Sequence, residues 1–294
     1  MLNESLLKYE KLIFTLCALG NSLMWSLGGV YTKISMYSMS PFYSMAFRFS
    51  IAAILFFIIF QKRIRKHIKE FFCWPTAIIC IVTILVFTCS HFSLKFSPAS
   101  IAGFLYCLAV IFSPFMSCLI LKSKLNLKHI LIVILIVVGM FFLCNGNNGF
   151  SFGWGEAFAL SCSVFFALEL VLQNKYLEKM DALTLAFIQS LAVAMAAWII
   201  AYIADGPLDI ASVTTESWIA VLYIGICGAM LATVFQNLAL SHLSANYVSM
   251  IFCIEPVLTA IFAYLRLGEV LAPISVIGGC IIVTGVLVAS RFGK

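Results

Sequence analysis

Residues 41–69 read PFYSMAFRFSIAAILFFIIFQKRIRKHIK and decide the class of protein. The first twenty residues of this stretch hold a single charged side chain, Arg48. A helix that crosses a bilayer needs about 20 largely apolar residues. The last nine residues hold five Lys and Arg side chains. A basic cluster directly after an apolar run is typical of a membrane-spanning helix that ends among anionic lipid headgroups.

The rest of the chain has the same character. Of its 294 residues, 63% are apolar and 10% are charged, and the mean hydropathy is +1.10. A soluble domain of this size needs more polar surface to stay in solution. We therefore predict an all-α integral membrane protein with ten transmembrane helices. The predicted spans are 12–34, 41–60, 73–94, 98–121, 127–144, 152–174, 182–204, 214–241, 244–265 and 272–290.

The placement of basic residues predicts the orientation in the membrane. If the N-terminus is cytoplasmic, fourteen of the eighteen Lys and Arg residues fall on the cytoplasmic side. Only Lys33, Lys95 and Arg266 fall outside, and Arg48 lies within a span. Cytoplasmic loops are enriched in Lys and Arg. We expect a multi-pass protein of the plasma or inner membrane with both termini in the cytoplasm. The net charge of +6 does not indicate nucleic-acid binding, because no reading motif accompanies it.

The cysteines give no sign of a metal site. Nearly all of the eleven fall inside apolar segments, where a thiol acts as a small hydrophobic group. No Cys-x-x-Cys spacing is present, so neither a disulfide framework nor a zinc site is predicted. We expect no cofactor and no metal.

The two halves of the chain resemble each other. Residues 19–53 match 160–194 without a gap, and Arg48 then lies opposite Gln189. Five spans is an odd number, so the second copy must enter the membrane from the opposite side. We predict a first five-helix repeat over 1–148 and a second, inverted repeat over 149–294. In transporters with this architecture the substrate site lies near the midplane, between the repeats.

Several short motifs resemble the EamA-type members of the drug/metabolite transporter superfamily. The motifs are Met24-Trp25-Ser26, Ala46-Phe47-Arg48-Phe49, Ala239-Leu240, Glu255-Pro256-Val257, Leu267-Gly268-Glu269 and Gly278-Gly279. The resemblance implies a central cavity lined by spans one, three, four, six, eight and nine, with spans five and ten packed at the side. It also implies transport of small organic solutes, often export of amino acids. One departure is the absence of an acidic residue after span four, where the chain reads Leu121-Lys122-Ser123-Lys124.

Glu169 is the first candidate for a functional side chain. An ionised group at the centre of a membrane helix costs about 2.5–3.5 kcal/mol, so it usually faces the bundle interior or a watery cavity. Gln173 lies four residues later on the same face. Glu169 either binds a cation or exchanges a proton in a cavity, or it is a buried carboxyl bonded to a neighbouring helix.

Arg48 and Glu255 are the other charged candidates within spans. Arg48 could bind a substrate carboxylate through its forked guanidinium, or it could pair with a carboxylate on a neighbouring helix. Glu255 precedes Pro256, which removes a backbone donor and frees carbonyls. It either gates or couples transport, or it holds the kink in place by bonding to another helix.

Further polar and aromatic residues at helical spacing predict a small polar cavity walled by aromatic rings, the kind of site a ligand needs. Each residue alone could instead make a packing hydrogen bond between helices, worth about 0.6 kcal/mol in membranes. The predicted substrate-binding set is Asn21, Trp25, Arg48, His91, Tyr106, Glu169, Gln173 and Gln236. The predicted coupling or gating set is Glu169, Glu255 and Pro256.

The function predicted from the sequence is secondary transport of small organic metabolites by alternating access, with export or exchange of amino acids or amino-acid-derived solutes favoured. Proton coupling is a hypothesis that rests on the buried carboxylate. One alternative is an uptake permease for a cationic or zwitterionic nutrient. A multispanning enzyme is the rival class, but no HExxH or GxSxG motif is present, and no Walker-type loop indicates ATP-driven pumping. The expected partners are a small-molecule substrate and the lipid bilayer, with no nucleic acid; a monomer and a homodimer both remain open.

Overall fold

Long apolar runs form the helices of this protein, because backbone polar groups in hydrocarbon must be satisfied within the segment. The computed structural model describes residues 2–123, 127–144, 153–268 and 272–292. The first half contains α1 (Leu2–Ser35), α2 (Pro41–His67), η1 (Ile68–Phe71), α3 (Trp74–Phe96), α4 (Ala99–Cys107), α5 (Ala109–Leu121) and α6 (Leu127–Cys144). The second half contains α7 (Trp154–Leu177), α8 (Ala182–Asp205), η2 (Ile210–Ser212), α9 (Thr215–Tyr223), η3 (Ile224–Leu231), α10 (Ala232–His242), α11 (Ala245–Phe252), α12 (Glu255–Leu267) and α13 (Pro273–Phe292).

Eight helical segments of the described chain are long and apolar enough to cross a membrane. Three of them contain more than one element: α4 with α5, α9 with η3 and α10, and α11 with α12. Two shorter apolar helices, Ile130–Phe142 and Val276–Val288, lie within α6 and α13. The protein is an all-α integral membrane protein whose segments fit the predicted ten-helix arrangement of two repeats.

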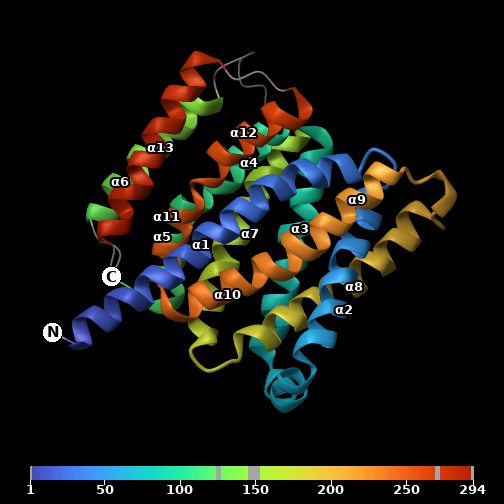
Figure 1. Cartoon of the computed structure of the whole chain (residues 1–294), viewed down its shortest axis with the longest axis horizontal. Helices are drawn as coiled ribbons and strands as arrows, with labels where there is room; N and C mark the ends of the chain where they lie inside the picture. Colours follow the sequence, from blue (N-terminus) through green and yellow to red (C-terminus); the bar gives the residue numbers. More distant parts are fainter. Residues whose placement is uncertain (1, 124–126, 145–152, 269–271, 293–294) are drawn as a thin grey trace.

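The two halves pack as a pseudo-symmetric pair. Helix α1 packs on α9, η3 and α10, and its counterpart α7 packs on α3. Helix α1 also contacts α12, as α7 contacts α5. The contacts of α2 with α8 and of α6 with α13 are those that a two-fold axis maps onto themselves. Figure 1 shows α6 and α13 side by side at one edge of the bundle, as predicted for spans five and ten.

Equivalent capping residues begin α2 and α8. The side-chain oxygen of Ser40 accepts a hydrogen bond from the backbone nitrogen of Tyr43 at 3.2 Å. The Asp181 carboxylate accepts one from the backbone nitrogen of Thr184 at 2.9 Å. Ser40 and Asp181 match in the repeat alignment, so both copies start their second helix with an N-cap. The predicted boundary between residues 148 and 149 lies outside the described residues.

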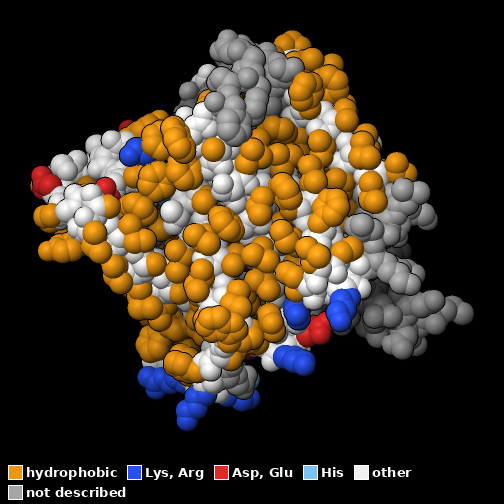
Figure 2. All heavy atoms as spheres, turned by 180° about the vertical axis from the view of Figure 1, so that it is seen from behind, with side chains coloured by type: hydrophobic (Ala, Val, Ile, Leu, Met, Phe, Trp, Pro, Cys, Tyr) orange, Lys and Arg blue, Asp and Glu red, His pale blue; other side chains and the backbone are white. Residues whose placement is uncertain are grey.

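The surface separates into an apolar band and polar ends. Figure 2 shows hydrophobic side chains over most of one face, with most of the visible Lys and Arg side chains at the lower end beside an acidic side chain, and further acidic side chains at the upper left. At the basic end Arg63 pairs with Asp181, with Nη2 of Arg63 2.7 Å from Oδ1 of Asp181. An apolar band with charged side chains at its ends is typical of a membrane-embedded bundle.

Candidate substrate cavity and inner polar network

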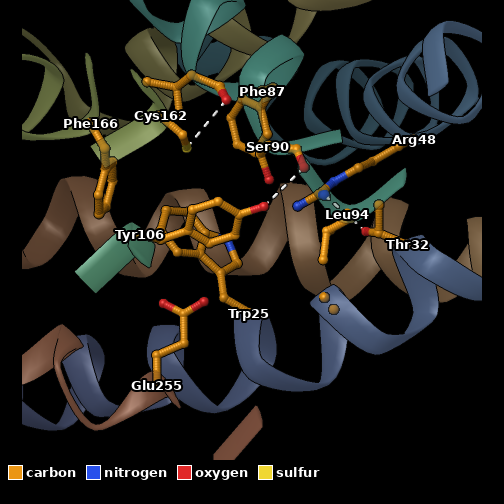
Figure 3. A pocket seen from close by; sticks show the side chains of 13 residues that line it. Trp25, Thr32, Arg48, Phe87, Ser90, Leu94, Tyr106, Cys162, Phe166 and Glu255 are labelled. Carbon is orange, nitrogen blue, oxygen red and sulfur yellow. Dashed lines mark hydrogen bonds between the residues drawn. The ribbon is translucent and has the colours of Figure 1, made fainter. Parts of the chain in front are cut away.

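The main cavity lies between the two repeats, beside the break that separates α11 from α12. Pro256 is the second residue of α12 and has no backbone N–H, so it suits a helix start, and Glu255 is thereby placed at the break. The cavity contains about 550 Å³ of empty space, which includes space open to its surroundings. Its lining residues, shown in Figure 3, are Trp25, Gly28, Gly29, Thr32, Arg48, Val86, Phe87, Ser90, Leu94, Tyr106, Cys162, Phe166 and Glu255.

Arg48 reaches the cavity from α2 and is 5% exposed. Its Nη2 donates to the backbone oxygen of Gly228 at 2.7 Å, and its guanidinium lies over the Phe87 ring at 5.1 Å from the centroid. Its Nε has no hydrogen-bond partner, and among the described residues Arg48 makes no ion pair. The cation is therefore held in position while its charge stays uncompensated by a carboxylate contact.

Glu255 reaches the same cavity from α12 and is 9% exposed. Its backbone oxygen accepts a hydrogen bond from Ser26 Oγ at 3.2 Å, but within the described chain its carboxylate has no hydrogen-bond partner. In Figure 3 the Glu255 carboxylate and the Arg48 guanidinium extend from different helices toward the same space. The cavity thus presents two opposite charges that are not paired with each other.

Aromatic rings form the wall between these charges. The Trp25 ring lies 5.4 Å from Phe166 and 5.8 Å from Phe252, measured between centroids, and Trp25 Nε1 donates to Gly228 O at 3.0 Å. The Tyr106 hydroxyl donates to the Ser90 backbone oxygen at 2.9 Å. These hydrogen bonds fix the polar ends of the two rings, so their flat faces are rigid parts of the cavity.

The backbone oxygen of Gly228 is a contact that the sequence did not predict. It belongs to η3, a π-helical segment, and accepts hydrogen bonds from both Arg48 and Trp25. Single π-helical turns inside α-helices are frequent at functional sites. Neither periodicity nor composition reveals a π-helix, and the run of residues 224–231 is uniformly apolar or glycine.

Glu169 lies outside this cavity, in a polar network deeper in the bundle. Its Oε1 accepts hydrogen bonds from Gln173 Nε2 at 3.2 Å and from Gln189 Nε2 at 2.9 Å, and Thr83 Oγ1 lies 2.8 Å away. Gln236 Nε2 extends the network by donating to Gln173 Oε1 at 2.8 Å. Sequence analysis found Glu169, Gln173 and Gln236, but Thr83 and Gln189 were not predicted as site residues.

We call the space beside this network the inner pocket; it contains about 270 Å³ of empty space, which includes space open to its surroundings. Its lining residues are Trp25, Phe49, Thr83, Phe87, Glu169, Gln189, Ser190, Thr233 and Gln236. Trp25 and Phe87 line both the inner pocket and the main cavity, so these two rings separate the two spaces. Span eight, which the resemblance placed at the central cavity, contributes to the inner pocket instead.

Three predicted substrate ligands, Asn21, His91 and Gln173, line neither space, and Gln173 belongs only to the network around Glu169. Asn21 is fully buried and donates through Nδ2 to the Ala232 backbone oxygen at 2.7 Å. His91 is 1% exposed, and its Nδ1 lies 2.8 Å from the Phe87 backbone oxygen. The Asn21 contact joins α1 to α10 and is a packing hydrogen bond between helices, whereas the His91 contact lies within α3, four residues apart. The predicted set of eight is thus divided among the cavity, the inner pocket and buried positions outside both.

Within the ranges that the structure describes, no group of three or more His, Cys, Asp or Glu side chains is placed to hold a metal ion. What remains is a multispanning membrane protein with a charged, aromatic cavity between two repeats, which is the architecture of small-solute transporters.

Comparisons with known proteins agree with this class. The model of the EamA-like transporter family matches twice, at residues 12–145 and 153–291. An uncharacterized transporter of Archaeoglobus fulgidus is 28% identical over 274 residues, covering 92% of this chain and 83% of that protein. An uncharacterized transporter of Clostridium kluyveri is 25% identical over 261 residues, covering 85% of this chain and 84% of its own length. One solved crystal structure superimposes with a TM-score of 0.79 at 19% identity, covering 95% of this chain and 97% of that chain, which shows the fold alone.

This chain belongs to the EamA-like transporter family. It is therefore a multi-pass membrane transporter and not an enzyme.

Proposed function

We propose that this protein is an alternating-access permease for amino acids or amino-acid-derived zwitterions, bound between Arg48 and Glu255. The observation that carries the proposal is the pair of buried, unpaired, opposite charges on facing walls of one cavity. A buried charge without a partner is costly, so a cavity that presents both signs is suited to a solute that brings both. The carboxylate of the solute would bind Arg48 and its ammonium would bind Glu255.

The aromatic wall supports the same class of solute. Trp25, Phe166 and Tyr106 offer flat apolar faces beside the two charges. An ammonium group over such a face gains cation–π attraction, and an apolar side chain gains burial. A purely anionic solute would leave the charge of Glu255 without a partner. A purely cationic solute would leave the charge of Arg48 without a partner.

Export or exchange is the direction that the family resemblance favours, and we propose it with uptake as the alternative. Coupling to an ion gradient fits the two carboxylates within the spans, Glu255 facing the cavity and Glu169 facing the inner pocket. The concentration of Lys and Arg at one end supports a plasma or inner membrane location with both termini in the cytoplasm.

The test is a thermal-shift screen of the detergent-purified protein against amino acids, polyamines, quaternary amines, nucleosides and sugar phosphates. A zwitterion at a hundred times its dissociation constant should raise stability by about 2.7 kcal/mol. Glu255→Gln should remove this stabilisation, because it removes the charge opposite the ammonium. The control is Glu156→Gln, which changes a buried carboxylate that lies outside the cavity. Stabilisation by sugar phosphates alone would contradict the proposal.

A further inference from the structure

We infer that the inner pocket is a binding site for a monovalent metal cation, with Glu169, Gln236 and Thr233 as ligands, and that this cation is the ion coupled to solute movement. The binding site is argued from the inner pocket alone; only its coupling role rests on the proposed function. Three features of the pocket carry the inference: its charge, the direction of its hydrogen bonds and its ligand chemistry.

The inner pocket contains a buried carboxylate, that of Glu169. Glu169 is 3% exposed, and within the described part of the chain it contacts no Lys or Arg. Arg48 lines the main cavity and not the inner pocket, and its guanidinium lies over the Phe87 ring, which lines both spaces. All three neighbouring donors reach Oε1, so Oε2 is left without a protein donor. A buried carboxylate in these surroundings is stabilised by a positive charge at its second oxygen, Oε2.

Hydrogen-bond direction then identifies a second ligand. An ionised carboxylate only accepts, so Gln173 must present its NH₂ group to Glu169 and keep its own oxygen for Gln236. Gln236 must therefore donate its NH₂ group to the Gln173 oxygen, and its own Oε1 is left without a donor in this relay. That oxygen is buried and has no hydrogen-bond partner among the described residues. An orphaned buried acceptor is a sign of a bound water or ion.

A parallel relay leads from the carboxylate through Gln189. The Nε2 of Gln189 donates to Glu169 at 2.9 Å, and its Oε1 accepts from Asn237 Nδ2 at 3.4 Å. The amide orientations are thus fixed from the carboxylate outward on both sides. In both relays an NH₂ group donates toward the carboxylate or the next amide oxygen, and at the end of the first relay the Gln236 Oε1 is left as an acceptor without a partner among the described residues.

The ligand set selects the class of ion. A carboxylate oxygen, an amide oxygen and the Thr233 hydroxyl are hard oxygen donors, which suit alkali and alkaline-earth cations. One carboxylate is neutralised by a single positive charge, whereas a divalent ion would leave a net charge buried in the bundle. A proton on Glu169 would neutralise the carboxylate, but its single O–H would satisfy only one of the oxygens, whereas a metal cation contacts all of them.

Thermal unfolding of the full-length purified protein, without any solute, tests this inference. Ionic strength is held constant with NaCl, LiCl, KCl or N-methyl-D-glucamine chloride. At least one alkali cation, tested up to 150 mM, should raise the unfolding temperature above that in N-methyl-D-glucamine, with a saturating dose response. Equal temperatures in all four salts would overturn the inference, as would a dependence on pH with none on the alkali cation.

Variants place the ion in the pocket. Glu169→Gln and Gln236→Leu should abolish the cation-dependent shift, and Thr233→Val should weaken the apparent affinity at least fivefold. Thr259→Val is the matched control, because Thr259 is also buried, at 3% exposed against 8% for Thr233, but lies beside Gly103 and does not line the inner pocket. A cation shift that persists in both Glu169→Gln and Gln236→Leu would overturn the assignment. If one of these variants fails to fold, Thr233→Val with its control decides the question.

The coupling role is tested separately. In proteoliposomes an inward gradient of the stabilising cation should drive solute flux in the wild type, and Glu169→Gln should lose this dependence. Because the shift assay contains no solute, absence of solute flux would refute the proposed function while leaving the cation site intact. A cation site without any effect of its gradient on flux would overturn the coupling role.

Discussion

Single residues at equivalent places in the two repeats carry different chemistry. Arg48 aligns with Gln189 in the gap-free match of the halves, and both lie seven residues after the start of their helix, at Pro41 and Ala182. Arg48 faces an open cavity, whereas Gln189 donates to Glu169 in a closed network. The symmetry of the fold is therefore broken at the residues where charge is placed, and each side of the midplane has its own ligand preference.

At the basic end, Asp181 provides a prediction about pH. Partial burial raises the pKa of Asp181, but hydrogen bonds from Arg63 and Thr184 and the charge of Arg63 outweigh burial and leave this pKa below its ordinary value. A carboxylate with a lowered pKa in the folded state stabilises that state at any pH above its ordinary pKa of 3.8. This stabilisation is lost as the pH falls through the lowered pKa. Asp181→Asn should therefore reduce stability by roughly 0.3–1 kcal/mol at pH 7, a small effect because Arg63 is 57% exposed.

The measurement is thermal unfolding in detergent from pH 7 to pH 3. The difference between wild type and Asp181→Asn should be constant at neutral pH and disappear in acid. Glu178→Gln, an exposed carboxylate at the same end, serves as the control and should show no such difference. A difference that grows on acidification would contradict the assigned sign.

The sequence predicted which residues face the interior better than it predicted their depth. Trp25, Arg48 and Tyr106 were expected near a substrate, and they line the main cavity, as does Glu255, which was expected to gate or couple transport. Glu169 was expected to share that cavity but faces the inner pocket. Helical periodicity reports the face on which a side chain lies, not its height relative to residues on other helices. Heights follow from how the repeats are packed, and no single helix encodes them.

At the scale of elements, the breaks inside spans matter most. The predicted span 244–265 is divided into α11 and α12, and Pro256 explains this break because it cannot donate to the preceding turn. The predicted span 98–121 is divided at Leu108, although Pro114 lies six residues further on, inside α5. No residue with a special backbone preference marks the break at Leu108, which is why the sequence showed an unbroken span there.

Close packing of α6 against α13 gives a prediction for elements. A Cβ atom added at Gly139 would lie 2.9 Å from the Gly278 backbone oxygen and 2.9 Å from Ile281 Cγ2. Small residues let membrane helices approach closely, since lipid supplies no hydrophobic drive for association. Gly139→Val should destabilise the protein by about 1–3 kcal/mol through overpacking. Thermal unfolding in detergent would measure this loss, with Val138→Leu as the control, because Val138 is 43% exposed on the outer surface. An unchanged unfolding temperature in Gly139→Val would show that the two helices can separate freely.

For the whole molecule, the pseudo-symmetric contacts imply two related states. The contacts of α2 with α8 and of α6 with α13 map onto themselves, so they can persist while α1 and α7 exchange environments. The cavity and the inner pocket lie on either side of Trp25 and Phe87, and one is open while the other is filled by a hydrogen-bonded network. In the proposed alternating-access cycle, we expect the inverted repeat to make the opposite arrangement accessible, with the inner pocket opened and the cavity closed.

Two matched substitutions test this exchange and separate a transporter from a channel. Ser90 lines the main cavity and Ser190 lines the inner pocket, and each differs from cysteine by one atom. In alternating access, the modification rates of Ser90→Cys and Ser190→Cys by N-ethylmaleimide should change in opposite directions when a stabilising solute is added. Coupling between sites in proteins is typically worth fivefold or more, so a change of at least about fivefold is expected. Peptide mass spectrometry reads each position separately from the native cysteines. A channel exposes both positions at once, so parallel changes in the two rates would refute alternating access, because two states related by the repeat cannot open both sides together.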